Sequence, residues 1–296
     1  MASVSADGSP TTAIGGCAEA TLGADAAGLS AEKDGVALPD FGNKDYWDLQ
    51  YSKAADEGEE VYDWLLGWEQ LRWLLEPLLA HDPRRAVLHL GNGNSPLPEE
   101  MYDAGYHVQT SVDISRVVME QMAARNRGAR PELRWLAADA RELGTKDVPS
   151  DSFELVIDKS TMDALFCHEE HALAIGQFIK EAFRVTSLGG VFLSVSMHRP
   201  NSVLRWLRRR AFPWTVRVVP FEHEQDSRPT PVAGGRRRRP ACHAYICSNK
   251  QGPADQILQG CGGSHWPALL QRLRGHPESD VSEEEDSSEE QEEEDD

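Results

Sequence analysis

Residues 86–95 read AVLHLGNGNS, an apolar run that breaks abruptly into two glycines separated by one asparagine. The run AVLHL is short and apolar, which is typical of a buried strand. Glycine loses more backbone entropy on folding than any other residue, so two of them directly after a strand need a reason. The turn either serves topology alone or lets a ligand approach the main chain, and the rest of the sequence decides between these interpretations.

Strand and helix patterns alternate on the C-terminal side of this turn. After the strand at 86–90, further strands are predicted at 107–113, 133–139, 153–158 and 191–197, with amphipathic helices between them. Two alternating segments, 214–221 and 241–248, are joined by a loop rich in Pro, Gly and Arg, which indicates an antiparallel pair. The sequence therefore predicts an α/β fold with a doubly wound, mostly parallel seven-stranded sheet and an antiparallel edge pair.

An aromatic-rich helical segment precedes the first strand, between residues 41 and 80. Trp47 and Tyr51 are four residues apart, so they share one face of a helix. A longer amphipathic helix follows and ends near His81-Asp82-Pro83. Its apolar positions, at core-facing spacing, are Trp68, Leu71, Leu74, Leu75 and Leu78.

The composition divides the 296 residues into four parts. Residues 1–38 hold almost no large apolar side chain, and 277–296 hold thirteen carboxylates and no cation, so both are predicted to be disordered tails. Between them, 39–250 form the folded domain and 251–276 a C-terminal extension. Without the thirteen negative charges of the last part, the net charge of −19 becomes −6. The acidic tail either solubilises the protein or engages a basic partner.

Several protein classes are disfavoured by composition. No segment approaches the roughly 18 apolar residues that a membrane span needs. The N-terminus lacks a basic region followed by an apolar stretch, which argues against a secretory signal. The five cysteines are odd in number and scattered, as in a reduced intracellular protein rather than a disulfide framework. These features predict a cytoplasmic protein without membrane contact.

Small and acidic residues stand at successive strand ends, where ligands of such sheets bind. Gly91 and Gly93 would let a ligand approach the backbone, although Pro96 replaces the third glycine of a dinucleotide fingerprint and argues against a dehydrogenase. Asp113, twenty residues after Gly93, could accept two hydrogen bonds from ribose hydroxyls or serve as a helix cap. Asp139 is predicted to bond an adenine amino group, or else to cap its loop.

Five segments carry a more specific resemblance: GNGNS, SVDIS, LRWLAAD, FELVIDKSTMDALF and FRVTSLGGVFLSVS. Together they resemble a seven-stranded, Rossmann-like methyltransferase that depends on S-adenosylmethionine. The lead-in KDYWDLQYSKAADEGEEVYDWLLGW is similar to that of the eukaryotic lysine methyltransferases that modify elongation factor 1-alpha. The resemblance covers about residues 41 to 249. It implies S-adenosylmethionine as cofactor and a protein-lysine substrate on elongation factor 1-alpha or a related translation protein.

The resemblance also implies which residues hold the cofactor. Aromatic residues of the lead-in close over it, a glycine turn contacts its methionine part, two strand-end pairs flank the ribose and adenine, and a lysine lies beside it. By position, the cofactor-binding residues are Trp47, Tyr51, Trp64, Gly91, Gly93, Asp113, Ile114, Asp139, Ala140 and Lys159. Asp158, Lys159 and Asp163 are predicted to line the acceptor pocket, although Asp158 is equally suited to cap the loop after the fourth strand.

Two positions depart from the family pattern. Asn92 stands where the family usually has cysteine, and it has room to hydrogen-bond the glycine loop. Ser160 stands where the family usually has glycine. A backbone with positive φ would strain a serine there, so the shape of the acceptor-side loop depends on this residue.

Three further clusters of polar or charged residues give weaker indications of function. The run Cys167-His168-Glu169-Glu170-His171 matches no closed zinc site, so no metal is predicted. Two arginine clusters, at 205–210 and 236–239, leave nucleic acid open as a partner through phosphate contacts, or else dock an acidic protein face. The alternatives to a protein methyltransferase are a small-molecule or nucleic-acid methyltransferase on the same fold, and an inactive cofactor-binding scaffold. The sequence does not indicate an oligomeric state.

Overall fold

The structure is a computed structural model that describes residues 32–33, 36–37, 39–56, 63–168, 170–221 and 242–249. Within the segment 1–38, predicted to be disordered, Glu32–Lys33 (β1) and Val36–Ala37 (β2) pair as short antiparallel strands. The remainder of that segment lies outside the described residues. So do the predicted extension at 251–276 and the acidic tail at 277–296.

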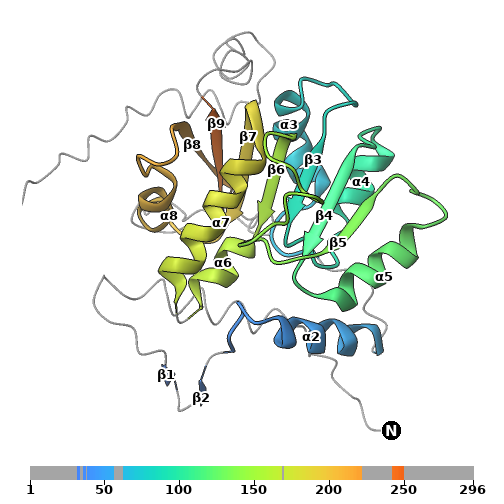
Figure 1. The fold of residues 1–296 in the computed structure, drawn as a ribbon, viewed down its shortest axis with the longest axis horizontal. Coiled ribbons are helices and arrows are strands. Elements are labelled where there is room, and N and C mark those ends of the chain that lie inside the picture. Colours follow the sequence, from blue (N-terminus) through green and yellow to red (C-terminus); the bar gives the residue numbers. More distant parts are fainter. Residues whose placement is uncertain are drawn as a thin grey trace, which may run out of the picture. The chain divides into compact units, whose positions relative to one another are not determined.

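One seven-stranded sheet organises the domain (Figure 1). Its spatial order is β5-β4-β3-β6-β7-β9-β8, in which the first five strands are parallel and β9 pairs antiparallel with both β7 and β8. The strands are β3 (Val87–Leu90), β4 (Gln109–Asp113), β5 (Arg134–Ala137), β6 (Phe153–Lys159), β7 (Thr186–Ser196), β8 (Trp214–Phe221) and β9 (Cys242–Asn249). The predicted α/β fold with its antiparallel edge pair is confirmed.

Seven helices accompany the sheet in the described part of the chain. They are α2 (Lys44–Asp56), α3 (Trp68–Leu78), α4 (Leu97–Asp103), α5 (Arg116–Asn126), α6 (Thr161–Phe166), α7 (His171–Val185) and α8 (Pro200–Leu207). The main core lies where α7 packs on β6 and β7, with Phe178 of the helix and Phe192 of the sheet both fully buried. Apolar side chains on one stripe of α7 account for this packing, as the helical periodicity predicts.

The order of the strands determines where a ligand can bind. The chain builds β3, β4 and β5 outward in one direction, and then returns to the other side of β3 to form β6. Loops that leave neighbouring strands in opposite directions open a crevice at the carboxyl end of the sheet. In this domain the crevice lies at the ends of β3 and β6, next to the end of β4.

The strand β7 begins earlier than the sequence suggests. The pattern predicts a start at residue 191 after a helix stopped by Leu188-Gly189-Gly190, but the helix ends at Val185 and the strand begins at Thr186. Thr186 already pairs with Phe153 of β6, and an irregularity then shifts the register before Val191. Helices α6 and α8 were not predicted, because six and eight residues are too few to show a clear helical period.

The central strand provides a test of the core. Leu88 of β3 has no exposed surface, so Leu88→Ala should lower the free energy of unfolding by about 2–5 kcal/mol through lost burial and a cavity. Leu173 on α7 is 57% exposed, and Leu173→Ala should change that free energy by less than about 0.5 kcal/mol. Urea titrations of both variants measure the difference. Equal effects would contradict the assignment of β3 to the core.

Candidate functional site

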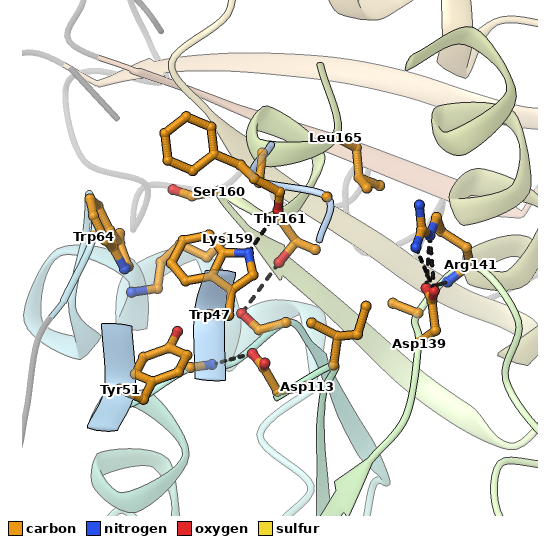
Figure 2. Close-up of a pocket in the computed structure, with 17 residues that line it drawn as sticks. Trp47, Tyr51, Trp64, Asp113, Asp139, Arg141, Lys159, Ser160, Thr161 and Leu165 are labelled. Carbon is orange, nitrogen blue, oxygen red and sulfur yellow. Dashed lines mark hydrogen bonds and ion pairs between the residues drawn. The ribbon is translucent and has the colours of Figure 1, made fainter. Parts of the chain in front are cut away.

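A pocket opens at the predicted edge of the sheet and encloses about 680 Å³ of space, part of it continuous with solvent (Figure 2). All ten residues predicted to hold a cofactor line it: Trp47, Tyr51, Trp64, Gly91, Gly93, Asp113, Ile114, Asp139, Ala140 and Lys159. They come from α2, from the segment that precedes α3, and from the ends of four neighbouring strands. The structure thus brings the whole predicted set together.

The glycine turn after β3 forms the floor of the pocket. Gly91 and Gly93 have φ of 65° and 55°, a left-handed conformation that glycine adopts readily. A Cβ on Gly91 would lie 1.9 Å from the Thr161 hydroxyl oxygen, so this glycine is also required by packing. The Asn92 amide donates to the carbonyl of Gly93 at 3.1 Å, which confirms the loop contact predicted for it.

Asp113 connects this turn to the next strand. One carboxylate oxygen accepts the backbone N–H of Gly93 at 2.8 Å, and the other accepts that of Ser115 at 2.9 Å. Burial raises the pKa of Asp113 to about 6, against the effect of these two hydrogen bonds. Ser115, not Asp113, is the N-cap residue of α5. The backbone N–H of Ile114 is a third group that lowers the pKa of Asp113 by hydrogen bonding. A carboxylate has about four acceptor positions, so some acceptor capacity remains for a ligand.

Two aromatic rings of α2 line the pocket, and the Tyr51 hydroxyl lies against Gly93 of the turn, where a Cβ would approach it to 2.4 Å. Trp47 and Tyr51 lie one helical turn apart and stack with ring centroids 5.8 Å apart. The indole N–H of Trp47 donates to the carbonyl of Phe41 at 2.7 Å. The helix is anchored to the domain where the Ser115 hydroxyl donates to Asp48 at 2.6 Å. The aromatic lead-in therefore belongs to the site and is not a separate element.

Asp139 has an internal partner that the sequence reasoning missed. Arg141 donates to both of its carboxylate oxygens, with the shortest contact 2.7 Å, and also lines the pocket. An adenine amino group would therefore share the Asp139 carboxylate with this guanidinium. The sequence shows that Arg141 follows Asp139 by two residues. It does not show the loop conformation that brings the guanidinium to the carboxylate.

Lys159 is the last residue of β6 and lines the end of the pocket that is away from Asp139 and Arg141 (Figure 2). Its ammonium forms an ion pair with Asp63, and its side chain is only 7% exposed. Apart from Asp63, no group in the described chain is an acceptor for the three N–H donors of this ammonium. Burial lowers the pKa of Lys159 to about 7, while the adjacent carboxylate favours the charged form. This end of the pocket thus holds a cation with unused donor capacity.

Ser160 follows Lys159 in the chain, and its backbone has the positive φ that the sequence analysis considered for this position. Its φ is 69°, which costs a residue with a Cβ of order 1–2 kcal/mol. Its hydroxyl is buried and has no hydrogen-bond partner, a further cost of about 1–3 kcal/mol. The residue lines the pocket beside Lys159.

Asp158 and Asp163, predicted to line an acceptor pocket, are buried and are not among the residues that line this pocket. The carboxylate of Asp158 accepts the N–H of Thr161 at 3.0 Å and the hydroxyl of Ser194 at 2.6 Å. Burial raises the pKa of Asp158 to about 7. Asp163 accepts from His198 Nδ1 at 2.9 Å and is 2% exposed. Both carboxylates are occupied by their own chain, so of the three predicted acceptor-side residues only Lys159 reaches the pocket.

The remaining clusters do not contribute side chains to the pocket lining, although Cys167 packs against Phe41 and Ala164, which do. The described residues contain no group of three or more His, Cys, Asp or Glu side chains arranged to hold a metal ion. In the first arginine cluster, the guanidinium of Arg209 lies over the Trp206 ring at 4.2 Å from its centroid. The second cluster, at 236–239, is outside the described ranges. In those ranges no helix has the length and apolar content to cross a bilayer.

Other pocket residues were not singled out by sequence reasoning. They are Phe41, Gly42, Arg141, Thr161, Ala164 and Leu165. Phe41 and Gly42 directly precede α2, and Thr161 directly follows the strand end that was predicted. Asp63, the partner of Lys159, lies 96 positions earlier in the chain, and no local pattern connects the two.

Comparison with known proteins agrees with this geometry. Residues 88–194 match the family described as "Methyltransferase domain". The chain is 36% identical over 184 residues to EEF1A lysine methyltransferase 4 of Mus musculus, which covers 60% of this chain and 69% of that protein. The corresponding protein of Bos taurus is 37% identical over the same length, with the same coverage.

A longer relative extends the match. The eEF1A lysine and N-terminal methyltransferase of Danio rerio is 34% identical over 224 residues, which is 76% of this chain. The chain spans only about a third of that protein, 31% of its length. The two relatives above, by contrast, are covered over more than two thirds of their length. By this similarity, the chain belongs to the eEF1A lysine methyltransferase family.

Proposed function

We propose that this protein is a cytoplasmic, S-adenosylmethionine-dependent protein-lysine N-methyltransferase, and that it acts on elongation factor 1-alpha or a related translation protein. The observation that carries the proposal is the convergence of the ten residues predicted to hold the cofactor on one pocket at the switch point of the sheet. The names of the relatives support the lysine acceptor and the elongation factor.

The pocket residues suit a ligand with a nucleoside at one end and an amino acid at the other. Near the end of β4, Asp113 keeps free acceptor positions for vicinal hydroxyls. The glycine turn of β3 leaves no side chain in the middle of the pocket floor. At the end of β6, the buried ammonium of Lys159 has donors to spare for a carboxylate.

The chain's own residues favour a cationic methyl donor. Bound S-adenosylmethionine would supply an electrophilic methyl group for in-line transfer to a nucleophilic acceptor nitrogen. The aromatic faces of Trp47 and Trp64 suit a cationic sulfonium, by about 0.5–2 kcal/mol. An acceptor amine must be neutral to react. None of these residues forms a covalent bond.

Asp113→Asn tests the nucleoside contact. The variant loses the charged acceptor, so its affinity for S-adenosylhomocysteine should fall by about a hundredfold, as expected for about 3 kcal/mol of charge-assisted hydrogen bonding. Asp103→Asn is the matched control, because that side chain is 58% exposed and pairs with Arg130 outside the pocket lining. Titration calorimetry measures both. Unchanged affinity in folded Asp113→Asn protein would refute the assignment.

The affinity should also depend on pH. Free Asp113 has a raised pKa of about 6, and hydroxyl donors favour its ionised form, so binding weakens as the carboxyl is protonated. Between pH 6.5 and 5 the dissociation constant of S-adenosylhomocysteine should rise by about tenfold. Asp158 and Lys159, with pKa values near 7, contribute little to the slope at the acidic end of this range. A dissociation constant that stays flat or falls toward pH 5 would contradict the model of Asp113 binding.

The substrate is tested with labelled cofactor. Purified elongation factor 1-alpha and a cell extract are each incubated with the protein and S-adenosylmethionine carrying a labelled methyl group, with Asp113→Asn as the inactive control. The proposal predicts label on a lysine of the elongation factor, identified by mass spectrometry. Label on RNA or on a small molecule, or no label in any fraction, would contradict it.

A further inference from the structure

Asp63 contacts three separate parts of the site. It lies ahead of α3 in the chain and forms an ion pair with the ammonium of Lys159, the last residue of β6. The carboxylate oxygen in that pair also accepts the hydroxyl of Ser95 at 2.9 Å, in the loop between β3 and α4. The other oxygen lies against Gly67, where a Cβ would approach it to 2.9 Å. The position of this side chain is therefore fixed by β6, by the loop after β3 and by the start of α3.

The ion pair of Asp63 differs from an exposed ion pair. The Lys159 side chain is 7% exposed and its ammonium nitrogen is buried, while the Asp63 side chain is 23% exposed. In the pair of Arg84 with Asp82, by contrast, the side chains are 86% and 32% exposed. Water and salt screen a buried pair much less than an exposed one, and separating a buried pair leaves its charges uncompensated. The pair therefore attaches the segment ahead of α3 firmly to the end of β6.

The residue that this attachment places is Trp64. It directly follows Asp63, lines the pocket and packs against the apolar cluster that contains Phe41. Figure 2 shows its ring at the same end of the pocket as Lys159. Residues 64–67 belong to no helix or strand. The position of the ring therefore depends on side-chain contacts, including those of the preceding carboxylate.

The helix α3 does not need Asp63 in order to begin. Gln70 accepts the backbone N–H of Gly67 at 3.0 Å, and Glu100 accepts that of Trp68 at 3.3 Å. These contacts and the buried apolar stripe of α3 hold the helix in place. The contacts of Asp63 therefore act on the segment ahead of the helix and not on the helix itself.

We infer that Asp63 is a positioning residue, which holds the Trp64 indole against the pocket through its ion pair with Lys159 and its hydrogen bond from Ser95. The indole then forms part of the wall of the cofactor site at the β6 end. Asp63 itself is not among the residues that line the pocket, so it acts through its neighbours. The inference rests on the proposed function, because it takes this pocket as the cofactor site.

Asp63→Asn and Trp64→Ala test this coupling in a double-mutant cycle. Each single variant should raise the dissociation constant of S-adenosylhomocysteine by about tenfold, as expected when one aromatic wall of a pocket is misplaced or removed. The double variant should also bind about tenfold more weakly than the wild type, and not about a hundredfold, because both changes remove the same contact. Titration calorimetry measures all four proteins.

The fluorescence of Trp64 gives a readout that does not depend on affinity. Subtracting the emission spectrum of the matching Trp64→Phe protein isolates this indole among the eight tryptophans. Asp63→Asn should shift that emission to longer wavelength, because the ring is released to water. Asp82→Asn is the matched control, since it neutralises the exposed partner of Arg84 outside the pocket lining and should change neither the emission nor the affinity.

A second variant separates this role from folding. Asp63→Asn leaves the Lys159 ammonium buried without a counter-charge, which lowers stability. Should that variant not fold, Asp63→Asn/Lys159→Met removes both charges, and adding Trp64→Ala to it should leave its affinity for S-adenosylhomocysteine unchanged.

Two results would overturn the inference and leave the proposed function standing. One is a hundredfold loss of affinity in Asp63→Asn/Trp64→Ala, and the other is a Trp64 emission that Asp63→Asn does not change. A wild-type protein that binds no S-adenosylhomocysteine would overturn the proposed function and this inference with it.

Discussion

The site depends on the buried carboxylate of Asp113. It accepts one backbone N–H from the glycine turn of β3 and another from the start of α5, so a single side chain connects two strand ends. Ser115, whose N–H it binds, uses its hydroxyl to hold Asp48 of α2. The floor of the pocket and the helix that lines it therefore share one point of attachment. Burying the carboxylate is costly, and these donors offset part of that cost.

The two ends of the pocket differ in charge and in completeness. At the β5 end, Asp139 and Arg141 already satisfy each other. At the β6 end, the groups of Lys159 and Ser160 are buried with hydrogen-bonding capacity unused. Satisfied groups stabilise the fold, whereas unsatisfied buried groups are expected where a ligand completes the network. The β6 end is therefore the part of the site where a ligand could complete the hydrogen bonding.

Most of the fold and the cofactor side of the pocket could be predicted from sequence. Buried strands of a parallel sheet are short apolar runs, and their ends meet at one edge, so Gly91, Asp113 and Asp139 could be placed together from their positions alone. The direction of a side chain after a strand end depends on loop dihedrals that no periodicity reports. For that reason Asp158 and Asp163 were expected in the pocket lining but are not part of it and are bonded to their own chain. The ion pair between Lys159 and Asp63 joins residues that are far apart in the sequence, so no local sequence pattern predicts it.

A crystal structure of the protein with S-adenosylhomocysteine tests the central claim most directly. The account predicts both ribose hydroxyls within hydrogen-bond distance of the Asp113 carboxylate, with the amino-acid end directed toward the tips of β3 and β6. Trp47 and Tyr51 should cover the ligand. A structure in which this ligand binds elsewhere, or in which Asp113 contacts only Gly93 and Ser115 while the ligand is bound, would contradict it.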